Sequence, residues 1–363
     1  MGGVRCPSQG WRFSDDAAEG LADRARTRNH ARVTWFERLT GVRETDGETV
    51  RRQFTLDGEW LESHANGRRL RHGTLELPSL AELRAHATPG HGSLRVREVV
   101  ADVGALHTDP ANASAFFQVA SQFNLLEMVS PHVTPEHGIG CYENDHTQGP
   151  ACAIAAGAGT IYRNYFVPVQ GSQGQAADRQ LDGLADLGNA LGNDAGRLWR
   201  MQNGYALPTR DGLATVAARV RAADDRARDR WRELLRIGVH RDTEVTRLDC
   251  GHVVTQAYCS ALPIACSRLP EADWEPFARL VLEAAYEATL CAAAEHAVRT
   301  GGRTCYLTLL GGGAFGNPMP WILDAATRAL LLHRESDLDV AFVSYGASQP
   351  AVHELVARFA TAK

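Results

Sequence analysis

The sequence predicts an α/β protein in which helices cover both faces of a central sheet. Short apolar runs typical of buried strands recur from residue 94 to the end of the chain, and segments with helical spacing of apolar residues lie between them. Several strand-like runs lead directly into glycine-rich or polar stretches. In open α/β sheets, such stretches are where ligands bind.

Composition fits one large folded unit or two smaller ones. The chain has 363 residues, of which 44% are hydrophobic and 22% charged, and its mean hydropathy is −0.26. The net charge of −5 argues against a general role in coating nucleic acid. No apolar run reaches membrane-spanning length, and the first residues lack the apolar core of a signal peptide. We therefore expect a cytoplasmic protein without a membrane partner.

Lysine and cysteine usage narrows the chemistry further. Lys363 is the only lysine, and all other members of the 38 Lys and Arg residues are arginine. This excludes a Schiff base, a Walker-type phosphate clamp or a kinase-type ATP clamp built on an internal lysine. The eight cysteines form no C-x-x-C pair, so we expect them to be reduced and mostly buried, without a zinc ion.

The amino-terminal part divides into two segments. Residues 1–30 are polar and arginine-rich, as is typical of a flexible leader. In residues 31–93, the turn signals Asp57-Gly58 and Asn66-Gly67 lie between strand-like flanks, which predicts a small antiparallel β unit. Ser79, followed three residues later by Glu82, predicts the start of a helix.

Strands and helices alternate through residues 94–363. Strands are predicted at 94–100, 115–120, 160–167, 252–258, 306–310 and 340–345, and helices at 175–191, 213–237, 274–298 and 321–332.

A glycine-rich loop, residues 311–318, separates a predicted strand from a predicted helix. Gly311, Gly313 and Gly316 fit the pattern G-x-G-x-x-G, but the next predicted strand lacks the terminal acid that would hold the ribose in a dinucleotide fold. We therefore predict that the amides of this loop cradle a phosphate. The alternative is a glycine turn that only packs the strand against the helix.

Two other segments carry candidate polar groups. Gln122 and Asn124 follow the predicted strand 115–120, either as ligand-binding side chains or as a capped strand exit. Glu143 and Asp145 lie in a polar loop that leads into a short helix of small residues, and paired carboxylates suit acid–base work on a glycosidic bond. The alternative is a solvated loop with two exposed acids.

Three histidines lie near this acidic loop. His132, His137 and His146 match no compact metal-binding spacing, so no metal site is predicted.

Taken in order, these segments resemble a divergent macrodomain, the ADP-ribose-binding three-layer α/β/α fold with a mixed central sheet. The resemblance covers roughly residues 33–350. It rests on a strand leading to Asp102, a strand leading to Asn124, the helix start at Gln148-Gly149 and the loop 311–318. This chain departs from simple macrodomains in having extra residues before Gly149 and a long helical insertion at about 168–249. We therefore divide it into residues 1–30, 31–93 and a macrodomain-like domain, 94–363.

Within macrodomains, the chain is most similar to the arginine-specific ADP-ribosylhydrolases. The likeness includes Trp-Phe-Glu-Arg-Leu-Thr-Gly at 35–41, the Ser-Gln-Phe-Asn and Glu-Asn-Asp segments, and the late Leu-Gly-Gly-Gly. The resemblance implies hydrolysis of the N-glycosidic bond between ADP-ribose and an arginine of a modified protein. Glu143 and Asp145 would be the catalytic acids, and no cofactor or metal would be required.

The resemblance also assigns the ligand contacts. Asp102 would accept a hydrogen bond from the adenine amine, and the loop amides would hold the diphosphate, with Phe315 packed on the ribose. The complete set of implied ligand-binding residues is Asp102, Gln122, Asn124, Gln148, Gly149, Gly311, Gly312, Gly313, Ala314, Phe315, Gly316 and Asn317. Two alternatives are a non-catalytic ADP-ribose reader and an unrelated nucleotide- or NAD-using enzyme that shares only the glycine loop.

Overall fold

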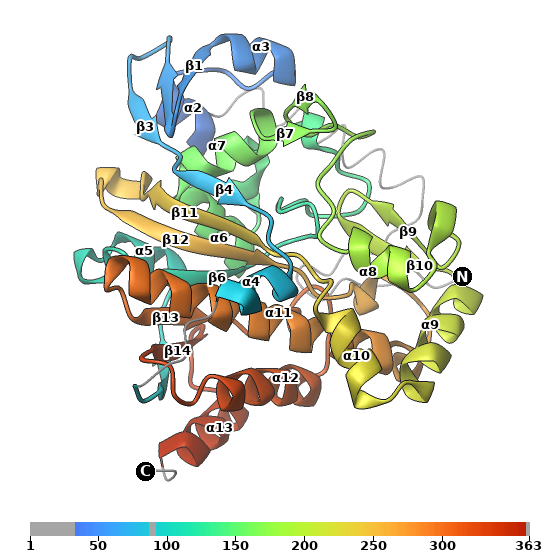
Figure 1. Ribbon diagram of the computed structural model, residues 1–363. Helices are drawn as coiled ribbons and strands as arrows, with labels where there is room; N and C mark the ends of the chain where they lie inside the picture. Colours follow the sequence, from blue (N-terminus) through green and yellow to red (C-terminus); the bar gives the residue numbers. More distant parts are fainter. Residues whose placement is uncertain (1–32, 87–91, 361–363) are drawn as a thin grey trace.

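The computed structural model describes residues 33–86 and 92–360 (Figure 1). At its centre is a seven-stranded sheet in the order β4-β11-β12-β6-β13-β14-β5. The strands are β4 (Thr74–Glu76), β11 (Gly238–Glu244), β12 (Val253–Cys259), β6 (Phe116–Ala120), β13 (Thr304–Leu307), β14 (Asp339–Ser344) and β5 (Arg95–Val100). The strands from β12 to β5 run parallel, whereas β11 is antiparallel to both its neighbours. The sheet is therefore mixed, as expected.

Helices cover both faces of this sheet, which confirms the three-layer prediction (Figure 1). One face packs against α11 (Glu271–Thr300) and α12 (Met319–Leu332), and the other against α5 (Val103–Thr108), α6 (Gln148–Ala155) and α7 (Gly157–Tyr165). Neighbouring strand residues point to opposite faces. Phe116 accordingly packs in the cluster that contains the α11 side chains, and Phe117 in the cluster that contains Cys152 of α6.

The N-terminal segment contains a second, smaller sheet. Its elements are α2 (Trp35–Thr40), α3 (Gly47–Arg52), β1 (Phe54–Asp57), β2 (Trp60–Ser63), β3 (Arg69–Arg71) and α4 (Leu80–His86). Strands β1, β2 and β3 pair antiparallel across turns in which Gly58 and Gly67 have positive φ, which confirms the predicted β unit. Ser79 and Glu82 cap α4 reciprocally, as expected. The predicted leader, residues 1–30, lies outside the described residues.

The segment 168–249 is more than the helical insertion expected there. It contains β7 (Pro168–Val169), β8 (Ser172–Gln173), α8 (Ala185–Ala190), β9 (Trp199–Gln202), β10 (Tyr205–Pro208), α9 (Arg210–Ala222) and α10 (Asp225–Arg232), followed by β11 of the central sheet. The helix predicted at 175–191 shrinks to α8, because the Gln175 amide donates to the carbonyls of Asn124 and Arg163 and holds this stretch against the core. The helix predicted at 213–237 is two helices, because Asp224 caps a new start.

One predicted strand is wrong. Residues 160–167 are β-rich in composition, but most of them belong to α7. Thr160 donates to the carbonyl of Ala153 in the preceding helix, and the fully buried Arg163 donates to the carbonyl of Leu125. These tertiary contacts favour the helix and override the local β propensity. The predicted helices 274–298 and 321–332 are confirmed as α11 and α12, and α13 (Pro350–Ala360) ends the described chain.

The described cysteines are free thiols, and most of them are buried. Seven cysteines within residues 33–86 and 92–360 are free thiols, and Cys152, Cys259, Cys291 and Cys305 are buried, as expected; Cys6 lies outside these residues. None of the helices in this part of the chain combines the length and apolar character needed to cross a membrane.

Candidate functional site

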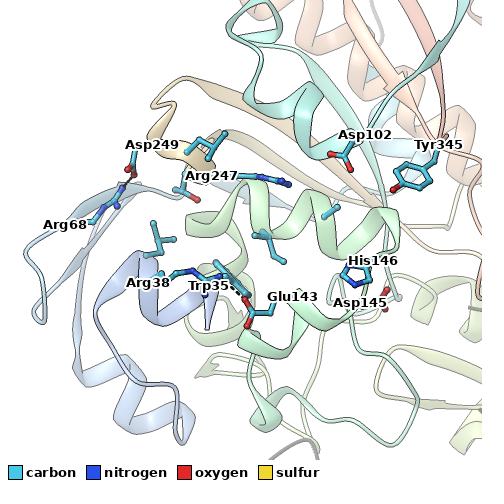
Figure 2. A pocket seen from close by; sticks show the side chains of 15 residues that line it. Trp35, Arg38, Arg68, Asp102, Glu143, Asp145, His146, Arg247, Asp249 and Tyr345 are labelled. Atoms are coloured by element: carbon cyan, nitrogen blue, oxygen red, sulfur yellow. Dashed lines mark hydrogen bonds and ion pairs between the residues drawn. The ribbon is translucent and has the colours of Figure 1, made fainter. Parts of the chain in front are cut away.

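The carboxyl ends of the five parallel strands meet at one edge of the sheet, and the candidate site begins there and extends toward the β11–β12 connection at the amino end of β12. Strand β5 leads to Asp102, β14 to Tyr345 and β13 to the glycine loop 311–318. A pocket of about 630 Å³ includes the first two of these residues (Figure 2). Its lining consists of Trp35, Arg38, Leu39, Arg68, Asp102, Glu143, Asp145, His146, Ala151, Ile154, Thr246, Arg247, Leu248, Asp249 and Tyr345.

Three predicted site residues, Asp102, Glu143 and Asp145, line this one pocket. They come from the end of β5 and from the loop before α6, and Ala151 and Ile154 of α6 add apolar lining. Asp102 and Tyr345 lie at one end of the pocket, near His146 and Asp145 (Figure 2). The structure thus brings Asp102, Glu143 and Asp145 to one pocket.

The acidic loop is held in place by Glu44 of the N-terminal segment. The two Glu44 carboxylate oxygens accept hydrogen bonds of 2.7 Å from the backbone N–H groups of Ile139 and Gly140, and Tyr165 donates a third of 2.5 Å. Gly138, with φ of +81°, leaves room for this carboxylate, which any Cβ at that position would strike. Burial raises the pKa of Glu44, and the three hydrogen bonds oppose that shift. Glu44 therefore positions the loop that presents Glu143.

Glu143 is not a free carboxylate. It accepts a hydrogen bond of 2.8 Å from Arg38 of α2, and its side chain is 17% exposed. The indole of Trp35 on the same helix donates to the carbonyl of Ile139 at 2.9 Å. Helix α2 thus contacts the acidic loop at two points, the backbone carbonyl of Ile139 and the side chain of Glu143.

Asp145 has a different environment. Its Oδ1 atom accepts from the backbone N–H of Thr147 at 2.9 Å, just before α6 begins. It forms no ion pair within residues 33–86 and 92–360. Of the two predicted acids, Asp145 is the one whose charge no arginine neutralises.

The end of the pocket that contains Asp102 combines an acid, an aromatic ring and a cation. Asp102 caps α5 by accepting from the N–H of Ala105 at 2.9 Å, and the nearby Tyr345 side chain is 79% exposed. Arg247 extends from the β11–β12 connection toward Asp102 (Figure 2). Arg68 is paired with Asp249 at 2.6 Å, whereas Arg247 has no ion pair in the described part of the chain.

Three predicted ligand-binding side chains bond inside the protein instead of lining the pocket. Gln122 accepts from the N–H of Met128 at 2.7 Å, and Asn124 accepts from the N–H of Leu126 and donates to Gln180. Gln148 accepts from the N–H of Ala120 and donates to the carbonyl of Gln118, so it ties α6 to β6. Gly149 is buried in the first turn of α6.

The glycine loop lies at the same edge of the sheet but does not line this pocket. Because β13 lies between β6 and β14, the loop lies between the exits of those two strands. Asn317 closes it by donating to the carbonyls of Leu262 and Gly311. The N–H groups of Gly312 and Gly316 bond within the loop, and Phe315 packs against Tyr205 with ring centroids 5.3 Å apart.

Some backbone amides of this loop are available to a ligand. The backbone N–H groups of Gly313 and Phe315 donate to no acceptor within the residues that the structure describes, and Gly312 and Gly313 are exposed. Free amides in a turn that precedes a helix favour an anion. Ala314, between them, completes the turn.

Sequence reasoning missed several residues of the site. Trp35, Arg38 and Glu44 belong to the N-terminal segment and contact the acidic loop from about a hundred residues away. Trp35 and Arg38 lie in the segment 35–41 that belongs to the family resemblance, but no local signal marks Glu44. No group of three or more His, Cys, Asp or Glu side chains in the described ranges is arranged to hold a metal ion.

Comparison with known proteins gives likenesses among solved structures alone. No protein-family model matches the sequence, and no curated protein does. A poly(ADP-ribose) glycohydrolase from Thermomonospora curvata has a TM-score of 0.44 and 14% identity over 86% of this chain and 95% of that chain. The Deinococcus radiodurans enzyme in complex with ADP-ribose has a TM-score of 0.36 and 12% identity, covering 78% and 92%. These neighbours are poly(ADP-ribose) glycohydrolases and not arginine-specific macrodomain hydrolases.

Proposed function

We propose that the protein is an ADP-ribosylhydrolase that removes ADP-ribose from mono-ADP-ribosylated protein, with arginine as the linked residue. The observation that carries this proposal is the pocket that gathers Asp102, Glu143 and Asp145, at an edge of the sheet where the glycine loop also has free amides. ADP-ribose is the ligand and product, and an ADP-ribosylated protein is the partner.

Each part of ADP-ribose has a suitable partner at this edge. A carboxylate next to an exposed aromatic ring, as in Asp102 and Tyr345, suits an amine-bearing aromatic base. The free amides of Gly313 and Phe315 suit a diphosphate. The acidic loop then lies where a cationic arginine substituent would be attracted.

Hydrolysis at the ribose needs groups that move protons and stabilise positive charge. The transition state has oxocarbenium character, which a nearby carboxylate stabilises. Asp145, with no arginine partner, is suited to take a proton from the attacking water, and Glu143 is suited to hold the leaving guanidinium. A positioned acid or base of this kind contributes about 10²–10⁴-fold in rate.

The test is to incubate the protein with arginine-ADP-ribosylated protein and measure released ADP-ribose. Serine-linked, glutamate-linked and poly(ADP-ribose) substrates run in parallel establish the linkage. Activity on the arginine-linked substrate alone supports the full proposal, and activity on another linkage replaces arginine. Release that continues unchanged in both Glu143→Gln and Asp145→Asn removes these residues from the mechanism.

A non-catalytic reader is the second candidate, because Arg38 already neutralises one of the two predicted acids. A reader would bind ADP-ribose in calorimetry and release none from any substrate. A nucleotide- or NAD-using enzyme would instead prefer NAD or a nucleotide in a thermal-shift panel.

A further inference from the structure

Glu127 is a buried carboxyl group that the mechanism above does not use. Its side chain is 4% exposed, and Oε1 has no hydrogen-bond partner; no other buried carboxylate oxygen in residues 33–86 and 92–360 is in this condition. An ionised carboxylate in such a place is costly, so the group is expected to hold its proton. Burial raises the pKa of Glu127 well above its usual value; Asp145 adds to the rise and Arg163 opposes it.

This carboxyl lies beneath the acidic loop and the first turn of α6, and it is not part of the pocket lining. The backbone N–H of Glu127 donates to the Tyr142 hydroxyl at 2.9 Å, one residue before Glu143. Its Oε2 atom fills the space beside Gly149, where any Cβ would collide with it. The carbonyl of the next residue, Met128, accepts a hydrogen bond of 2.6 Å from Tyr205, whose ring packs against Phe315 of the glycine loop.

The segment that carries Glu127 is firmly held. Gln122 accepts from the N–H of the residue after it, at 2.7 Å, and Asn124 accepts from the N–H of the residue before it, at 3.1 Å. Two polar side chains are therefore used to fix the backbone around one carboxyl whose own oxygen has no partner. Buried groups with perturbed pKa values concentrate at functional sites, since few folds tolerate them otherwise.

We propose that Glu127 is the proton donor of this site, an acid additional to Glu143 and Asp145; the inference rests on the proposed function. The bond between C1 of the distal ribose and the arginine nitrogen breaks, and its electron pair stays on nitrogen. The Glu127 carboxyl proton passes to that nitrogen. A water oxygen bonds to C1, and the water proton passes to the Asp145 carboxylate. The products are ADP-ribose and the arginine guanidinium, and proton exchange with solvent returns both carboxyls to their starting states.

Glu127→Gln tests this, because the amide keeps the shape of the side chain and cannot donate a carboxyl proton. We expect turnover of the arginine-linked substrate to fall about 10²–10⁴-fold while the affinity for ADP-ribose in calorimetry is unchanged. The wild-type rate should decline as the pH rises through the raised pKa of Glu127, and this decline should disappear in the variant. Glu127→Asp, which keeps an acid, should recover part of the rate.

Glu287→Gln is the matched control. Glu287 is also buried at 4% exposure, but it lies on α11 and is paired with Arg84 at 2.6 Å and Arg328 at 2.5 Å. We expect this variant to lower stability in urea unfolding and to leave turnover per folded molecule unchanged.

The outcomes separate the inference from the function on which it rests. An active wild type with an equally active Glu127→Gln overturns the inference alone, as does a Glu127→Gln that no longer binds ADP-ribose or a Glu127→Asp no faster than it. A wild type that releases ADP-ribose from none of the substrates overturns the proposed function and this assignment with it.

Discussion

Arg38 and Glu143 form an ion pair of 2.8 Å that joins the N-terminal segment to the acidic loop across 105 residues of sequence. The Arg38 side chain is 54% exposed, so the pair lies at the rim of the pocket, where water competes with it. Ion pairs at such positions contribute about 0–1 kcal/mol to stability. A guanidinium on a substrate is chemically the same group as the Arg38 side chain and would compete for the same carboxylate.

Replacing Arg38 should therefore improve binding of an arginine-linked substrate. In Arg38→Gln, Glu143 is free to accept the substrate guanidinium, so we expect KM for that substrate to fall severalfold while the unfolding transition barely moves. Steady-state kinetics and thermal unfolding measure the two quantities. Arg52→Gln is a suitable control, since that arginine pairs with Glu48 on exposed helix surface away from the pocket. A KM equal to the wild-type value would show that Glu143 does not contact the guanidinium.

Asp102 offers a substitution that separates its charge from its role at the helix start. Asparagine caps helices as well as aspartate does, so Asp102→Asn should leave α5 and the stability of the protein intact. Losing a hydrogen bond to a charged group costs about 1.5–3 kcal/mol, so the affinity for ADP-ribose should fall about tenfold or more. Calorimetry with ADP-ribose and with ribose 5-phosphate distinguishes the adenine end: only the first ligand should weaken.

Gly313 tests whether the glycine loop holds an anion. A Cβ at this position would meet nothing, and the backbone φ is not positive, so Gly313→Ala should fold normally and bind ADP-ribose almost as well as the wild type. Gly313→Asp places a negative charge among the free amides and should weaken binding at least tenfold, with stronger loss at low ionic strength. Equal affinities of the two variants would place the diphosphate elsewhere.

His107 makes folding stability depend on pH. The ring is fully buried, with Nδ1 2.8 Å from the carbonyl of Val103 and Nε2 3.0 Å from the side-chain nitrogen of Gln256, so a proton on Nε2 would face a donor. Burial lowers the pKa of His107 from 6.5 to about 4. Below pH 6.5 the unfolded chain takes up a proton that the folded chain refuses until about pH 4. His107 alone should thus lower the free energy of unfolding by roughly 2 kcal/mol between pH 7 and pH 5.

Urea unfolding at these two pH values measures the effect. His107→Gln cannot titrate, and it should reduce the pH dependence by about this amount even if it is less stable at both values. If the variant and the wild type lose the same stability on acidification, His107 is not responsible for the loss.

Features that depend on neighbouring residues were predictable from the sequence. The turns at Asp57-Gly58 and Asn66-Gly67 and the reciprocal cap of Ser79 and Glu82 follow from local hydrogen bonding and backbone freedom, and all three are present. The strands that form the parallel part of the sheet are short apolar runs, which burial on both faces requires. These local patterns were sufficient to predict the strand that leads to Asp102.

What depends on distant contacts could not be predicted. The segment 160–167 has the composition of a strand, and only its burial against Ala153 and Leu125 makes it a helix. Glu44 looks like an ordinary surface charge in the sequence, and only the fold brings it to the acidic loop. Glu127 follows Gln122 and Asn124, which the sequence marked as candidate site residues. No local pattern distinguishes an acid with a hydrogen-bond partner from one without.

Strand β4 pairs with β11 and so joins the N-terminal segment to the central sheet. This strand belongs to the N-terminal segment, yet it forms the outer rim of the central sheet through Leu75 and His240. A shortened chain beginning at residue 94 would lose the pocket wall formed by Trp35 and Arg38, and it would also leave one side of β11 with bare peptide groups. Such an uncovered rim recruits strands from other molecules. A chain shortened to begin at residue 94 should therefore self-associate, and it should not serve as a minimal enzyme.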